Sequence, residues 1–188
     1  MRKKLILTGG FILVLMISFW RQIQYGYFDF QEYLTLRDKI IWSENNQLDW
    51  EDFIYAPDQN YMDNILTDVG IAARYHIGDS QIEYRSTTAF VPSKSFVSDT
   101  TNPTALRIAN VRFNLCEVYR RKLESKIKVL KTTDVEDVPL DTLKNQHKIF
   151  IDQFEKEWDT FLDVPENLVE KELLELEKRV SIELKKSY

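Results

Sequence analysis

The sequence predicts an α+β fold, in which a small antiparallel sheet is followed by three helices and an N-terminal membrane helix precedes both. Three observations support this prediction. Two β-rich runs, 65–77 and 81–91, flank a Gly-Asp-Ser turn, apolar stripes of helical spacing follow after residue 102, and an uncharged apolar run occupies residues 5–20. Strands and helices are therefore grouped along the chain rather than alternating, which favours α+β over repeated βαβ units.

Length and composition limit the classes of protein to consider. The chain has 188 residues, 44% of them hydrophobic, and its 25 basic and 30 acidic residues give a net charge of -5. These values suit one domain with a substantial core and exclude a disordered or collagen-like chain. Residues 1–21 contain four basic and no acidic residues, so the remainder carries a net charge of -9. Such an acidic domain argues against a nucleic-acid partner.

The N-terminal segment has the features of an export signal or a membrane anchor. Three basic residues precede the apolar run, and aromatic residues follow it. The run is about 24 Å long as a helix, which is short for a hydrocarbon core, but no small-x-small cleavage site follows it. We expect residues 1–21 to be an uncleaved signal anchor, residues 22–38 a juxtamembrane connector and residues 39–188 the exported domain. The basic end of the anchor should stay in the cytoplasm, with Trp20 and the following tyrosines at the outer interface.

The first part of the exported domain predicts a sheet. Residues 39–42 are typical of a short strand, and Trp50 and Phe53, three apart, predict one helical turn packed on that sheet. The runs 65–77 and 81–91 predict a β-hairpin. Alternate residues of the second run share one face, which holds Ile82, Tyr84, Ser86, Thr88 and Phe90.

The first of the three helices is predicted to start at Asn102 and Pro103, because Asn is a favoured N-cap and Pro suits the first helical position. Apolar residues then recur at steps of three and four, the spacing of one helix face. We expect this face to pack on the sheet. Its members are Leu106, Ala109, Phe113, Cys116, Leu123, Ile127 and Leu130.

Two further helices are predicted after the charged segment 131–139. The second helix ends at the sequence Asp-Val-Pro of residues 163–165, and Pro165 can begin the third. The apolar face of the second helix holds Leu143, Phe150, Phe154, Trp158 and Phe161. The apolar face of the third holds Val169, Leu173, Leu176 and Val180.

Three segments carry a resemblance to a known family. Residues 41–53 contain Trp-Ser and then Leu-Asp-Trp-Glu-Asp-Phe, residues 90–97 read Phe-Val-Pro-Ser-Lys-Ser-Phe-Val, and residues 112–123 begin Arg-Phe-Asn-Leu. They resemble segments of the bacterial domain-of-unknown-function family nine-two-two, which comprises predicted secreted zinc-dependent proteases. The resemblance extends over residues 40–184. It implies a zincin-like fold in the bacterial cell envelope, held at the inner membrane with the C-terminal domain on the periplasmic or extracellular side, or secreted if the anchor is cleaved.

The zinc-binding motif of that family is missing. Proteases of this type bind zinc through two histidines of a His-Glu-x-x-His motif, and the Glu activates the bound water. The matching positions here run from Ile108 and Ala109 to Arg112, and Val164 stands where the family has a distal histidine. Apolar side chains cannot coordinate zinc, and an arginine is permanently protonated. We therefore expect a pseudoenzyme with no catalytic residue, no metal and no cofactor.

The helix predicted to start at Asn102 and Pro103 has a second face, which is expected to point into the family's cleft. It holds Ile108, Arg112, Leu115 and Tyr119, and Arg112 is expected either to pair with Asp159 or to be an ordinary solvated arginine. A cleft or an open sheet edge can bind an extended peptide or a protein partner. The candidate partner contacts are Phe96, Arg112, Tyr119, Trp158 and Asp159.

Two other functions stay open from the sequence. One is an active hydrolase whose ligands lie elsewhere, with Cys116, His76 or His147 as reactive residues, although Cys116 lies on an apolar stripe and isolated histidines are commonly structural. The other is a structural envelope protein that the N-terminal segment holds at the membrane.

Overall fold

The computed structural model describes residues 19, 22, 24–59, 64–77, 82–133 and 138–186. The chain divides into two compact units, Met1–Arg37 and Asp38–Tyr188. Within the first unit, residues 24–36 are helical, while the predicted anchor over residues 1–21 lies outside the described residues except for Phe19. No helix among the described residues is both long enough and apolar enough to cross a membrane.

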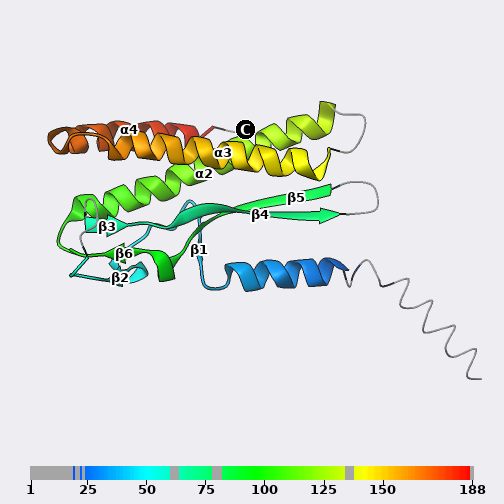
Figure 1. Cartoon of the computed structure of the whole chain (residues 1–188), viewed down its shortest axis with the longest axis horizontal. Helices are drawn as coiled ribbons and strands as arrows, with labels where there is room; N and C mark the ends of the chain where they lie inside the picture. Colours follow the sequence, from blue (N-terminus) through cyan, green and yellow to red (C-terminus); the bar gives the residue numbers. More distant parts are fainter. Residues whose placement is uncertain are drawn as a thin grey trace, which may run out of the picture. The chain divides into compact units, whose positions relative to one another are not determined.

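The second unit confirms the predicted α+β class, with two small sheets and three long helices (Figure 1). The strands are β1 (Ile40–Ile41), β2 (Ile54–Tyr55), β3 (Ile65–Leu66), β4 (Val69–Ile77), β5 (Ile82–Phe90) and β6 (Phe96–Val97). The helices are α2 (Pro103–Thr133), α3 (Leu140–Leu162) and α4 (Val169–Leu184), and the short 3-10 helices are η1 (Trp50–Asp52), η3 (Pro92–Lys94) and η4 (Glu166–Leu168).

The larger sheet has the order β1-β5-β4 and is antiparallel throughout. The predicted hairpin supplies its middle strand, β5, and one edge strand, β4, which pair along their whole length from Val69 opposite Phe90 to Ile77 opposite Ile82. The predicted strand over residues 39–42 is confirmed as β1, which pairs Ile40 with Phe90.

A second sheet corrects the expectation of a single antiparallel one. Its order is β2-β6-β3, and β2 runs parallel to β6. The run predicted as one strand over residues 65–77 is divided at Asp68, whose N–H donates to Ser95 Oγ at 2.9 Å and whose carbonyl accepts from Val91 N–H at 2.9 Å. Because the backbone of Asp68 bonds to residues 91 and 95, β3 leaves the hairpin and pairs with β6 instead.

Helix α2 is the centre of the second unit, with the hairpin on one side and α3 and α4 on the other (Figure 1). Its predicted N-cap is confirmed, because Asn102 Oδ1 accepts from Thr104 N–H at 3.0 Å. The predicted apolar face is buried, with Leu106 and Leu130 half-buried at its ends. Against it lies Phe90 of β5, whose ring is 6.3 Å from that of Phe113.

Helices α3 and α4 begin and end close to where they are predicted. Asp163 is the C-cap of α3, and Pro165 precedes η4 and then α4. Their predicted apolar faces are buried or half-buried. The one difference is that α2 continues to Thr133, three residues into the segment 131–139 predicted as a loop.

Truncation of Phe90 tests this core. The side chain is fully buried and its ring lies 5.1 Å from that of Phe53, so Phe90→Ala should lower the free energy of unfolding by about 3–5 kcal/mol in urea denaturation. Tyr55→Ala is the control, because Tyr55 is 62% exposed, and it should cost less than about 1 kcal/mol. Equal losses for the two variants would contradict this packing.

Candidate binding groove

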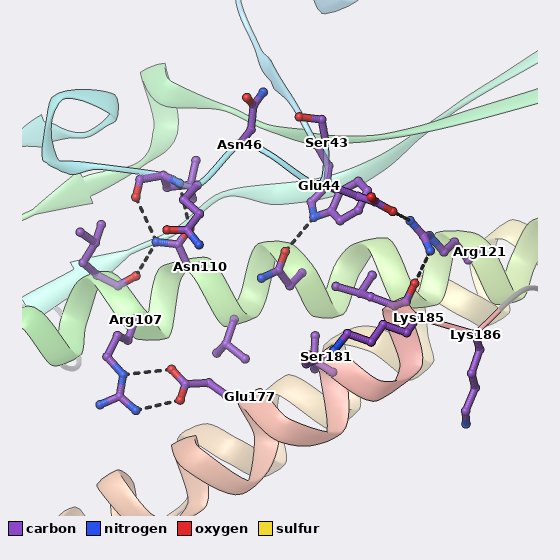
Figure 2. Close-up of a pocket in the computed structure, with 18 of the residues that line it drawn as sticks. Ser43, Glu44, Asn46, Arg107, Asn110, Arg121, Glu177, Ser181, Lys185 and Lys186 are labelled. Carbon is purple, nitrogen blue, oxygen red and sulfur yellow. Dashed lines mark hydrogen bonds and ion pairs between the residues drawn. The ribbon is translucent and has the colours of Figure 1, made fainter.

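A groove with a volume of about 1360 Å³ lies across a partly covered face of α2. Its walls are the segment over residues 42–50 on one side and α4 on the other, as Figure 2 shows for Ser43 and Asn46 against Glu177 and Ser181. The apolar part of the lining consists of Trp42, Leu48, Trp50, Pro103, Leu106, Val111, Val180 and Leu184. Every one of these residues belongs to the second unit of the chain.

Two asparagines on α2 fasten the segment 42–50 to the helix. Asn110 Oδ1 accepts from Leu48 N–H at 2.8 Å and Asn110 Nδ2 donates to Leu48 O at 3.0 Å, so one side-chain amide pairs with both backbone groups of one residue. One turn further on, Asn114 Oδ1 accepts from Trp42 Nε1 at 2.7 Å. The predicted helical turn after this segment is present as η1, with Asp49 as its N-cap. Apart from the Trp42 N–H, which donates to Thr88 O of β5 at 3.0 Å, the bonds described here between this groove wall and the rest of the domain come from side chains of α2.

Arg121 joins three parts of the groove at its other end. Its guanidinium donates to Leu184 O at the end of α4 at 2.6 Å and to Glu117 at 2.8 Å, and it lies over the ring of Trp42 at 5.1 Å. Glu44 is a further ion-pair partner at 3.8 Å. A cation at this point stabilises the carbonyl end of the α4 dipole and stacks on an indole at the same time.

Behind Arg121 lies a buried carboxylate, Glu117, which is 2% exposed. Its oxygens accept from Arg120 in two bonds of 2.7 Å, from Arg121 and from Thr88 Oγ1 at 2.9 Å. Burial works to raise the pKa of Glu117, but the hydrogen bonds from the two arginines outweigh it and hold the pKa below the ordinary value. Glu117 is therefore a charged group in the core that links α2 to β5.

The groove is more basic than the chain as a whole. Five basic residues (Arg107, Arg121, Lys128, Lys185 and Lys186) line it, against three acidic ones (Glu44, Glu124 and Glu177). Arg107 is neutralised by Glu177, to which its Nε and Nη2 donate at 3.0 and 2.8 Å. Lys128 and Lys185 take part in no ion pair within the described part of the chain. Free positive charge therefore collects where α2 passes the C-terminal end of α4.

The helix face that was expected to point into a cleft is instead covered by α3. Ile108 is 3% exposed, and Ala109 is fully buried on the adjoining face. Leu115 and Tyr119 are also buried, and Tyr119 OH donates to Glu157 of α3 at 2.5 Å. Packing against α3 fills the position of the expected cleft, and the groove lies on another face of α2.

Arg112 pairs with a different residue from the one predicted. Its Nη2 donates to Glu155 at 3.2 Å, and its guanidinium lies 5.2 Å from the ring centre of Trp158. The predicted partner, Asp159, is exposed one turn further along α3. The difference arises because α3 presents Glu155 and Trp158 toward α2, so the arginine is covered by an indole and is not an ordinary solvated side chain. Its buried Nε has no acceptor among the described residues.

The remaining predicted contact positions do not meet at one site. Trp158 is 3% exposed and belongs to the core, and Phe96 is partly buried in β6, the middle strand of the second sheet. Val164 follows the end of α3, where its N–H donates to Phe161 O at 3.2 Å. A partner could reach Asp159 but not Trp158 or Tyr119, since these two rings pack inside the helix layer.

His147 and Cys116 have structural surroundings. His147 Nε2 donates to Ile71 O at 3.1 Å, which leaves Nδ1 to accept from Tyr75 OH at 3.3 Å, and burial lowers the pKa of His147. Cys116 is fully buried, and burial strongly raises the pKa of its thiol. A thiol held in its neutral form is a poor nucleophile. His76 lies on β4 opposite Glu83.

The groove was not predicted from the sequence, where the only cleft expected was the one beside the missing zinc motif. One signal was present: Asn110 and Asn114 are four apart, and Glu117 interrupts an apolar stretch with Arg120 and Arg121 three and four residues later. Polar residues at that spacing share a helix face and predict a bonded polar cluster. The partners on residues 42–48 could not be predicted, because they are more than sixty positions away in the sequence.

Fold and groove together define an α+β domain with a preformed, partly basic groove. Among the described residues, no group of three or more His, Cys, Asp or Glu side chains could hold a metal ion. Comparison of the chain with family models, with curated proteins and with solved structures found no match.

Substitution of Glu117 tests the buried charge cluster. Glu117→Gln removes the buried anion that Arg120 and Arg121 share, and we expect it to lower the free energy of unfolding at neutral pH by about 3 kcal/mol. Because the folded-state pKa is lowered, this stabilisation is lost as the pH falls through it, so the difference from the wild type should shrink below about pH 4.5. Urea denaturation at several pH values measures both effects. Glu175→Gln, at an exposed position, should change stability by less than about 0.5 kcal/mol.

The His147 bonds predict a second pH dependence. Burial lowers the pKa of His147 below 6.5. As the pH drops below about 6.5, the histidine therefore becomes protonated more readily in the unfolded chain than in the folded chain, and the free energy of unfolding falls. His147→Gln can keep both hydrogen bonds without titrating, so its stability should fall less steeply between about pH 6.5 and pH 5. Lys148→Gln, at the exposed neighbouring position, should keep the wild-type slope. Parallel curves for all three proteins would contradict this assignment.

Proposed function

We propose that the chain is a membrane-anchored, exported protein without catalytic activity, and that its groove binds an extended acidic segment of a peptide or protein partner. The observation that carries the proposal is the groove itself, whose aromatic and apolar lining ends at a group of cations. Aromatic side chains and arginine dominate the binding energy of protein interfaces. Trp42, Trp50 and Arg121 supply both types of side chain here.

The size of the groove favours a polymer over a small metabolite. Small-molecule sites typically have volumes of about 300–1,000 Å³, and this groove, at about 1360 Å³, exceeds that range. It also follows α2 between two walls (Figure 2), which suits an extended segment of chain.

Its charge favours an acidic segment. Lys128 and Lys185 have no acidic partner within the described residues, so a carboxylate of the ligand would gain an ion pair there without breaking one. The Arg107–Glu177 pair at the opposite end is already satisfied. Complementary charge of this kind increases the rate of association and sets the direction in which a ligand lies.

The groove is preorganised, which lowers the entropic cost of binding. Asn110 and Asn114 hold the wall over residues 42–50, and Arg121 holds the end of α4. The apolar lining is therefore in place without the ligand.

The proposal includes the family resemblance and a non-catalytic role. A long helix packed on an antiparallel sheet is compatible with a zincin-like fold, and the chain would then be a pseudoenzyme of that type in a bacterial envelope. Ile108 and Ala109, at the positions of the missing zinc motif, support this role because they are packed in the core. Residues 1–21 would hold the domain at the membrane.

A groove-filling variant tests the proposal. Peptides enriched from a random library on the full chain in detergent should be acidic, and Ser181→Trp should lower their affinity at least about tenfold, or 1.4 kcal/mol, by fluorescence anisotropy. Ser181 is an exposed residue of the groove lining, so a bulky side chain there occupies the site and removes no buried contact. Lys128→Glu with Lys185→Glu should weaken binding similarly, and more at low salt.

Lys178→Trp is the matched control, since Lys178 is exposed on the same helix but is not part of the groove. Equal affinities for Ser181→Trp and Lys178→Trp would place the peptide elsewhere on the molecule. Failure of the library to enrich any peptide would contradict the binding function, and stoichiometric zinc in elemental analysis of the purified chain would contradict the non-catalytic role.

A further inference from the structure

The helix over residues 24–36 is the unlabelled blue helix in Figure 1. Four of its large apolar side chains are exposed. The exposed fractions are 63% for Tyr27, 55% for Phe30, 63% for Tyr33 and 45% for Leu34. Soluble proteins seldom expose large apolar side chains as a contiguous group, and such groups commonly mark a surface that contacts a membrane or another protein.

These four residues lie on one face of the helix. Steps of three and four residues connect Tyr27, Phe30 and Leu34, and Tyr33 is adjacent to them on the helix surface. The face contains no charged residue. Phe28, which is 8% exposed, lies on another face, so burial of the apolar residues of this helix is confined to one side.

We propose that this face lies in the headgroup layer of the membrane, with the helix parallel to the bilayer surface. The inference rests on the anchoring role proposed for residues 5–20. Trp20, the last residue of that apolar run, is four positions before Gln24. Four residues span at most about 14 Å, and the headgroup layer adds about 5–8 Å on each side of the hydrocarbon core. The helix therefore begins in or beside the headgroups.

The side chains suit that layer. Tyrosine is enriched at membrane interfaces because its ring enters the apolar boundary while its hydroxyl stays hydrated. Phe30 and Leu34 provide the deeper apolar contact that interfacial helices make. The predicted connector thus becomes a second point of attachment, which limits how the domain that follows can turn relative to the membrane.

Site-directed labelling of the full chain in vesicles of phosphatidylcholine and phosphatidylethanolamine tests the inference. An environment-sensitive dye is attached at Tyr27→Cys or Phe30→Cys and, as matched controls, at Gln24→Cys or Thr35→Cys, which are exposed positions on a different face. Cys116 is fully buried and should stay unlabelled, which mass spectrometry of the labelled protein checks. A further label at Leu13→Cys reports independently whether the apolar run inserts.

A blue shift, with quenching by brominated lipid, is expected at positions 27 and 30 and not at 24 and 35. Equal spectra at all four positions would overturn the inference, even if the label at 13 shows an inserted anchor. A blue shift at positions 27 and 30 without one at position 13 would support the surface location of the helix but contradict the anchoring role of residues 5–20. A shift that disappears as the protein is diluted in lipid would place a second copy of the chain on this face and overturn the inference.

Discussion

The second unit depends on keeping the carboxylate of Glu117 charged inside the core. A buried ion is stable only with full hydrogen bonding, and here two arginines and Thr88 supply it. These bonds connect more elements than the two residues of one ion pair. Thr88 brings β5 to α2, and Arg121 reaches from the same carboxylate to the end of α4 and the ring of Trp42. Sheet, central helix, last helix and groove wall thus meet at one charge cluster.

The position of the groove follows from how α2 distributes its faces. One face packs on the hairpin, a second on α3 and a third on α4, and the last is only partly covered by the segment 42–50. Because this segment is fastened by Asn110 and Asn114 and contributes no strand, it does not close over the helix. An incomplete cover of a central helix produces a groove in which apolar side chains and bonded polar groups alternate.

Periodicity predicted the elements of this fold well, because α2, α3, α4 and the hairpin each carry a regular apolar pattern that burial enforces. The division at Asp68 was not predictable, since it depends on hydrogen bonds to residues 91 and 95. The site was predicted less well. Arg112 was expected in a cleft because the helix face that would carry the zinc motif was expected to stay open. Trp158 and Glu155 of α3 cover this face instead. Position along a helix defines a face, but only tertiary packing determines which faces are filled.

The side-chain amide of Asn110, which bonds both backbone groups of Leu48, controls hydrogen exchange at that residue. The Leu48 N–H is bonded to the side chain of Asn110, so it can exchange with solvent deuterium only when the segment 42–50 separates from α2. Since the same amide also holds the Leu48 carbonyl, the two bonds open as one event. If this proton exchanges faster than the slowest amides of α2, the difference measures how often the groove wall separates from α2 without global unfolding.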